Sequence, residues 1–346
     1  MTPRIIRNET PWQVLALGLI PLVLFVGLSA FLSAYGNEGV SINFAFDQDA
    51  AEERFYLQAE LTGRYRFFAA VLFYTMICLG VTIIVALEIV ASHTRKSCLQ
   101  LLALWFFLAA AYLILVAPEF GMNNSSTFHL IDEPYYKTAL TLGATTACGE
   151  DCPRTALTVF ERLTFLSNIA TAIGATAAVV AMISTISEPR LGNEDEKLDH
   201  ELEAAHLSAC AADSQRYIIL AGAVLSSGIV SFAAWTHWPL GMLPDMEKKV
   251  LSEVAEALTL YTGVTFSVLI LSYFLPSAAF HSSRAQRIAE RYFSDQGTIV
   301  TNSMVSTWRK DHKLTAEPIA ALKVIAATTS PILASTLGGV PGFGAF

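Results

Sequence analysis

Long apolar stretches dominate the hydrophobic pattern of the chain. Each runs for about 20 residues without Lys or Arg, which is the length a helix needs to cross the hydrocarbon core of a bilayer. Because lipid offers no partners to backbone polar groups, such stretches must be helices. The pattern predicts an all-α fold, a polytopic transmembrane helix bundle of about six spans with short extramembrane helices. The predicted spans are residues 12–34, 67–91, 98–118, 163–186, 217–238 and 257–280.

The residues after the sixth stretch predict a separate region. We expect residues 1–280 to form the six-helix transmembrane domain, and residues 281–346 to form a cytoplasmic juxtamembrane helix with an apolar C-terminal tail. Within this tail, residues 318–337 are apolar but contain Lys323, Pro331 and many small residues. This pattern favours a helix packed on the membrane face or on a partner over a seventh span.

The distribution of Lys and Arg predicts the orientation. Basic residues precede the first stretch, occupy the short turn after the second, and follow the sixth directly, which places them on one side of a six-span protein. Cytoplasmic loops carry the excess of Lys and Arg in membrane proteins. We therefore expect a protein of the cell membrane with both termini in the cytoplasm. The basic positions are Arg4, Arg7, Arg95, Lys96, Arg284, Arg287 and Arg291.

Composition agrees with this class and excludes others. Hydrophobic residues make up 53% of the chain and charged residues 15%, against about 25% charged in soluble domains. The net charge of −8 argues against a nucleic-acid partner, because such proteins carry a basic footprint. We find no catalytic constellation, and we expect no cofactor and no metal. His93 and His281 fall at cytoplasmic helix ends near Glu88, but a closed metal site needs more ligands.

Small and hydroxyl residues mark three of the stretches as different from the rest. The candidate positions are Asn168, Thr171, Gly174, Ser227, Ser231, Thr265 and Ser272. Small residues let helices approach closely, so one interpretation is tight packing among these spans. The other is that the polar stripe lines a water-filled path or meets its copies in an oligomer. No charged residue lies near the membrane centre, which disfavours a proton-driven transporter.

Two further patterns predict local chemistry. Cys148 and Cys152 lie in a loop predicted outside the cell, where an oxidising compartment favours a structural disulfide. Arg284, Arg287 and Arg291 recur at helical spacing, which is typical of a basic helix that binds anionic lipid headgroups.

These patterns lead to two hypotheses of different classes. The first is an oligomeric, channel-like or membrane-permeabilising protein whose partners are the lipid bilayer and its own copies. The alternative is a non-catalytic scaffold or accessory subunit of a larger membrane complex, with membrane-protein partners. An enzyme ranks last, because no converging set of titratable groups is found.

Overall fold

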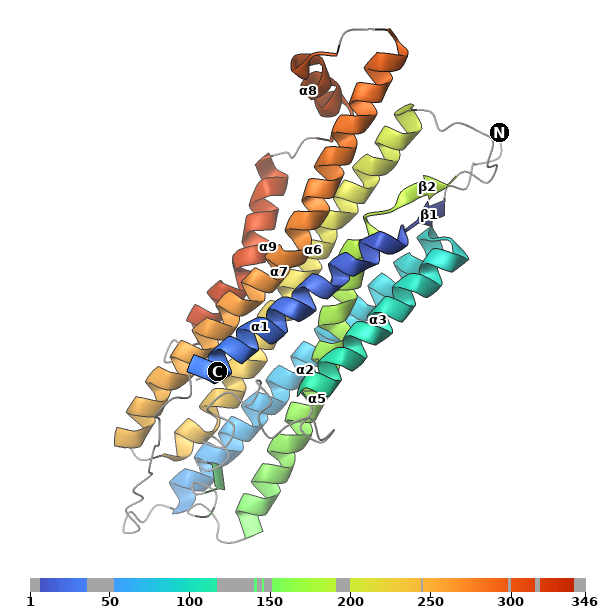
Figure 1. Cartoon of the computed structure of the whole chain (residues 1–346). Coiled ribbons are helices and arrows are strands. Elements are labelled where there is room, and N and C mark those ends of the chain that lie inside the picture. The colour runs from blue at the N-terminus through green and yellow to red at the C-terminus, as the bar shows by residue number, and fades with distance from the viewer. Residues whose placement is uncertain are drawn as a thin grey trace.

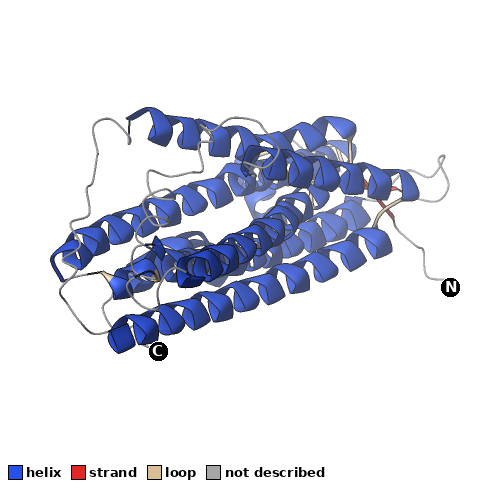
Figure 2. Cartoon of the chain, turned by 90° about the horizontal axis from the view of Figure 1, so that it is seen from below, coloured by secondary structure: helices blue, strands red, loops and turns tan. Residues whose placement is uncertain are grey.

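The described part of the computed structural model is all-α apart from two three-residue strands. It describes residues 7–35, 53–116, 140–141, 145, 151–190, 200–243, 245–297, 300–314 and 318–338. Figure 1 shows the long helices lying side by side in an elongated bundle, and Figure 2 shows the same bundle after a quarter turn.

The elements follow the chain in a simple order. The helices are η1 Trp12–Gly18, α1 Leu19–Tyr35, α2 Glu53–Ser92, α3 Arg95–Val116, α5 Asp151–Ser184, α6 His200–His237, η3 Pro239–Met242, α7 Asp245–Asp295, α8 Asn302–Asp311 and α9 Pro318–Gly338, and the strands are β1 Arg7–Glu9 and β2 Glu188–Arg190.

Five helices in the described part of the chain are long and apolar enough to cross a membrane, namely α2, α3, α5, α6 and α7. They coincide with most of each of the predicted spans two to six, which confirms the all-α class and agrees with a multi-pass membrane protein. The first predicted span is divided between the 3-10 helix η1 and α1. The change occurs just before Pro21, whose missing N–H is tolerated in the first turn of an α-helix.

The helices extend well beyond their apolar stretches. α6 begins at His200 rather than near residue 217, and α7 continues to Asp295 rather than ending near residue 280. Charged residues and good helix formers fill these extensions, so each helix continues after its apolar stretch ends. Hydropathy alone predicts only the apolar part of each helix.

The interior of the bundle is apolar and well packed. Val180, Met182 and Ile218 are completely buried where α5 and α6 meet the other helices. A second cluster contains four buried aromatic side chains, and the rings of Phe160 and Trp235 stack with centroids 5.5 Å apart. The outer faces are apolar too, since Phe106 on α3 is 78% exposed. Large exposed apolar surfaces mark membrane or protein contacts, and here they agree with a lipid-facing exterior.

The helix α9 lies against α6 and α7 within the bundle. A Cβ atom at Gly222 of α6 would lie 2.8 Å from the carbonyl oxygen of Ala327. A Cβ atom at Gly263 of α7 would lie 2.8 Å from the carbonyl oxygen of Pro331. This placement differs from the expected helix on the membrane face or on a partner. The physical reason is that glycines on α6 and α7 let the backbone of α9 approach closely.

The proline inside α9 is compensated by this packing. Pro331 has no N–H to donate to the carbonyl oxygen of Ala327, one turn earlier. The Ser330 hydroxyl donates to that oxygen at 2.8 Å, and the Ser226 hydroxyl of α6 donates to Ser330 Oγ at 2.9 Å. Pro331, which counted against a membrane span in the sequence, is therefore accommodated in α9 with the help of a hydrogen bond from α6.

The two strands close one end of the bundle. β1 pairs antiparallel with β2, with Asn8 opposite Pro189, and Asn8 also forms a bridge with His93 in the turn between α2 and α3. The start of the described chain is thereby tied to the connection that follows α5, at the same end of the bundle as α8 (Figure 1).

Candidate functional site

Two positions of the predicted polar stripe hold α5 against α2. The Thr171 hydroxyl lies 2.7 Å from the Tyr74 hydroxyl, within hydrogen-bond distance. A Cβ atom at Gly174 would lie 2.6 Å from Cys78 Cβ, which only glycine avoids. These contacts are tight helix packing of the kind that small residues permit.

The hydroxyl positions on α6 and α7 act mainly within their own helices. Ser227 donates to the carbonyl oxygen of Val224 at 2.9 Å, and Ser272 donates to that of Leu269 at 2.7 Å. Ser231 is 2% exposed. No hydrogen bond joins any two of the seven stripe residues in the part of the chain that the structure describes.

Asn168 and Thr265 differ from the other stripe positions. Both side chains are half-buried, and neither has a hydrogen-bond partner among the described residues. An unpaired amide at the depth of the apolar stretch is costly in lipid, because nothing there replaces water. Asn168 is therefore the stripe residue that most needs water or another chain.

The predicted disulfide stays a prediction. Cys148 lies outside the described residues, and nothing is described of the Cys152 side chain. Cys78, Cys98 and Cys210, the cysteines whose side chains are described, are free.

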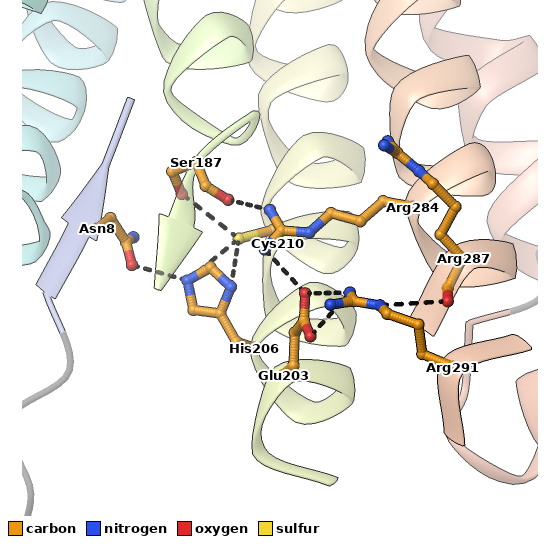
Figure 3. A network of polar contacts seen from close by, with 8 residues as sticks. All are labelled: Asn8, Ser187, Glu203, His206, Cys210, Arg284, Arg287 and Arg291. Carbon is orange, nitrogen blue, oxygen red and sulfur yellow. Dashed lines mark hydrogen bonds and ion pairs between the residues drawn. The ribbon is translucent and has the colours of Figure 1, made fainter. Parts of the chain in front are cut away.

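A charged network joins α6 and α7 to Ser187, the residue before β2, at the end of the bundle that carries β1 (Figure 3). The guanidinium of Arg284 is buried, and it donates to the Ser187 carbonyl oxygen at 2.7 Å and to Glu203 at 3.4 Å. Arg291 donates to both carboxylate oxygens of Glu203, at 3.2 and 3.1 Å. Two of the three arginines predicted to bind lipid headgroups are thus bonded to one buried carboxylate.

Arg287 and Arg291 are both exposed, but the Arg287 side chain has no partner among the described residues. Its guanidinium points away from Glu203 and back along α7 (Figure 3), as expected of a helical side chain. Beside it is a cleft of about 740 Å³. The cleft is lined by Glu188, Pro189, Glu203, Phe280, Arg284, Arg287, Glu290, Arg291 and Ser294.

Histidines lie next to this network. His206 Nε2 lies 2.7 Å from Asn8 Oδ1, and His93 Nε2 lies 3.3 Å from the Ser184 carbonyl oxygen. Both imidazoles lie outside the apolar stretches. Burial lowers the pKa of His93. Burial, with the Arg284 charge as a second cause, lowers the pKa of His206 to about 4. Both are therefore neutral near pH 7.

The residues considered for a metal site have separate partners. His281 Nε2 lies 3.2 Å from the Thr185 hydroxyl, while Glu88 accepts hydrogen bonds from Arg216 and Tyr217. Among the described residues, no group of three or more His, Cys, Asp or Glu side chains could hold a metal ion.

Sequence reasoning missed Glu203 as the centre of the charged network. A signal was present, because Glu203 precedes Leu207 by four residues and Cys210 by seven. That spacing puts the carboxylate on the apolar face of α6. An acid on such a face needs a cationic partner, which the arginines after the sixth stretch provide.

Compared with protein-family models, curated proteins and solved structures, the chain shows no match in any of the three.

Proposed function

We propose that this multi-pass membrane protein acts as a non-catalytic scaffold or accessory subunit of a larger membrane complex. The observation that carries the proposal is the use of stripe residues inside the bundle. Thr171 and Gly174 face α2, and Ser226, the residue before the stripe position Ser227, bonds to α9. Side chains engaged in this way support a dry, packed interior rather than a continuous wet path.

The helices that project from the apolar region support the same proposal. α6 begins 17 residues before Tyr217, which corresponds to about 25 Å of helix. The projecting ends of α6 and α7 form an apolar cluster with α8, in which Ile288, Val305 and Trp308 are buried. A rigid helical module on one side of the membrane suits the docking of a partner protein.

The proposed topology has this module in the cytoplasm. The end of the bundle that carries this module also carries Arg95, Lys96 and the arginines of α7. This agrees with the enrichment of Lys and Arg in cytoplasmic segments. We infer seven crossings, by α1, α2, α3, α5, α6, α7 and α9. The contacts of Ala327 with Gly222 and of Ser335 with Gly263 support a crossing by α9. Gly338 would then face the outside, in contrast to the six-span expectation of two cytoplasmic ends.

Reporter fusions test this topology directly. A reporter active only outside the cytoplasm should be active when fused after residue 338 and inactive when fused after residue 314. Activity at neither position would show that α9 does not cross, and would restore the six-span arrangement.

A second candidate function is the oligomeric, channel-like or membrane-permeabilising one. The observation that favours it is Asn168, a half-buried amide of α5 without a partner among the described residues. In an oligomer, copies of this amide could meet one another or line a wet path. Interhelical hydrogen bonds contribute only about 0.6 kcal/mol each in a membrane, so several copies would have to act together.

Release of ions and dye from proteoliposomes separates the two candidates, with the oligomeric mass measured in the same preparation. The scaffold proposal expects tight vesicles for the wild type and for Asn168→Leu. Phe165→Leu, an exposed apolar position on the same helix, is the matched control. Release that saturates with a defined oligomer and falls only in Asn168→Leu would overturn the scaffold proposal in favour of a channel.

A further inference from the structure

We propose that the cleft beside Arg287 binds the headgroup of a zwitterionic phospholipid that carries a primary ammonium group, of the ethanolamine type. Arg287 binds the phosphate and Glu188 binds the ammonium. The inference rests on the proposed membrane insertion and adds a specific lipid ligand to it.

The depth of the cleft fits a lipid headgroup. Phe280 ends the apolar stretch of α7 and also lines the cleft. Arg287 follows seven residues later, about 10 Å further along the helix. The headgroup region covers roughly the outer 5–7 Å on each side of the hydrocarbon core. Because the Arg287 side chain points back along α7 (Figure 3), its guanidinium reaches this level.

The charges that remain free select the headgroup. Arg284 and Arg291 are both bonded to Glu203, and Glu290 accepts a hydrogen bond from Gln286. In the described part of the chain, Arg287 and Glu188 have no side-chain partner. One free cation and one free anion therefore line the same cleft.

A zwitterion matches this pair better than an anionic lipid does. A guanidinium donates two parallel hydrogen bonds to a phosphate, and a primary ammonium donates to a carboxylate. The cleft is lined by three arginines and three glutamates, so its formal charge is zero and an anionic headgroup would leave an uncompensated charge. A trimethylammonium group has no N–H to donate to Glu188, so a choline headgroup makes one fewer contact.

Glu203 keeps the site in place. It holds Arg284 and Arg291 on one side of α7, so that Arg287, on a neighbouring position of the same helix, is left to face the cleft. The two bonded arginines give the cleft a fixed wall, and Arg287 supplies the contact to the ligand.

Native mass spectrometry of the full chain in detergent tests the proposal. The protein is titrated with phosphatidylethanolamine, phosphatidylcholine and phosphatidylglycerol of matched acyl chains, and with soluble glycerophosphoethanolamine. We expect the ethanolamine lipid to bind best, and Arg287→Gln to weaken its binding about tenfold, the effect of losing a hydrogen bond to a charged group. Arg95→Gln, an exposed arginine at the same end of the bundle, should bind like the wild type.

A second variant tests the ammonium contact. Glu188→Gln should remove the preference for ethanolamine over choline and strengthen the binding of phosphatidylglycerol, because it removes a negative charge from the cleft. Equal binding of the ethanolamine lipid by Arg287→Gln and Arg95→Gln would overturn the proposal, as would a wild-type preference for phosphatidylglycerol. Equally tight binding of glycerophosphoethanolamine would assign the cleft to a soluble ligand and overturn the lipid proposal.

Two measurements keep the outcomes separate. Melting temperatures must match between the variants and the wild type, so that lost binding reports the site rather than the fold. Resistance of the chain to alkaline extraction from membranes tests insertion on its own. A chain that resists extraction but shows no lipid preference refutes this inference and leaves the proposed membrane function standing.

Discussion

Replacing the two glycines beneath α9 tests the packing of this helix most directly. In the double variant Gly222→Ala with Gly263→Ala, each new methyl group meets a carbonyl oxygen of α9 at 2.8 Å, against 3.4–4 Å for ordinary contact. The nearest atoms include backbone atoms of Ala327 and Pro331. They cannot rotate away as a flexible side chain would, so α9 must shift as a whole.

The magnitude follows from two opposing effects. Overpacking of a well-packed contact costs about 1–3 kcal/mol at each site, while Gly→Ala within a helix stabilises it by about 1 kcal/mol. We expect a net loss of about 2 kcal/mol for the pair. The second substitution should cost less than the first, because α9 has already moved when both are present.

The assay is thermal unfolding of the purified chain in detergent, compared with Gly80→Ala. A Cβ atom at Gly80 of α2 meets nothing within 4 Å, so this control has the propensity gain without the clash. We expect a melting temperature several degrees lower for the double variant, and an unchanged or higher one for the control. If the double variant is as stable as Gly80→Ala, α9 does not pack against these glycines and the reasoning is wrong.

Three further predictions concern α9 and the charged network. Because the hydroxyls of Ser226 and Ser330 lie 2.9 Å apart, cysteines at these two positions should form a disulfide under mild oxidation, detected by mass spectrometry of the peptides. Glu203→Gln should lower the free energy of unfolding by about 3 kcal/mol, because it leaves the buried Arg284 without its carboxylate. The melting temperature should fall between pH 7 and pH 5, and fall less in His206→Gln. The reason is that the pKa of His206 is about 4 in the folded chain and about 6.5 in the unfolded chain. Between pH 7 and pH 5 the unfolded chain therefore binds more protons than the folded chain, and lowering the pH favours unfolding.

Each of these predictions has a matched comparison. A cysteine at Leu333, which is 58% exposed, should not form the bond with a cysteine at position 226. Glu201→Gln, an exposed acid in the first turn of α6, should change stability little. An equal pH dependence in the wild type and in His206→Gln would show that His206 titrates normally when folded.

The apolar pattern predicted those helices that are recognisable from the length of their apolar stretch. Five of the six predicted stretches coincide for most of their length with helices long enough to span a membrane, because a run of some 20 apolar residues has few alternatives. α9 could not be placed in this way. Lys323 and Pro331 weaken its hydropathy, and its packing depends on Gly222 and Gly263, which lie far away in the sequence. A single sequence does not reveal which helices those glycines face.

The same distinction applies to the candidate residues. Composition singled out the small and hydroxyl positions of α5, α6 and α7, but it could not tell that Thr171 and Gly174 face α2. The spacing of the three arginines predicted one common role. The helix instead turns Arg284 towards Ser187 and leaves Arg287 exposed. Side chains one helical turn apart can have different surroundings when a neighbouring helix carries a buried acid.

The pairing of β1 with β2 limits when this end of the bundle can form during synthesis of the chain. Glu9 and its partner Glu188 are separated by about 180 residues, which a ribosome adds in roughly 10–40 s at typical rates. Throughout that interval β1 has been synthesised, but β2 has not, so the two strands cannot pair. Closure of this end of the bundle must therefore wait until α1 to α5 have been made, and α6 to α9 are added only after both strands exist.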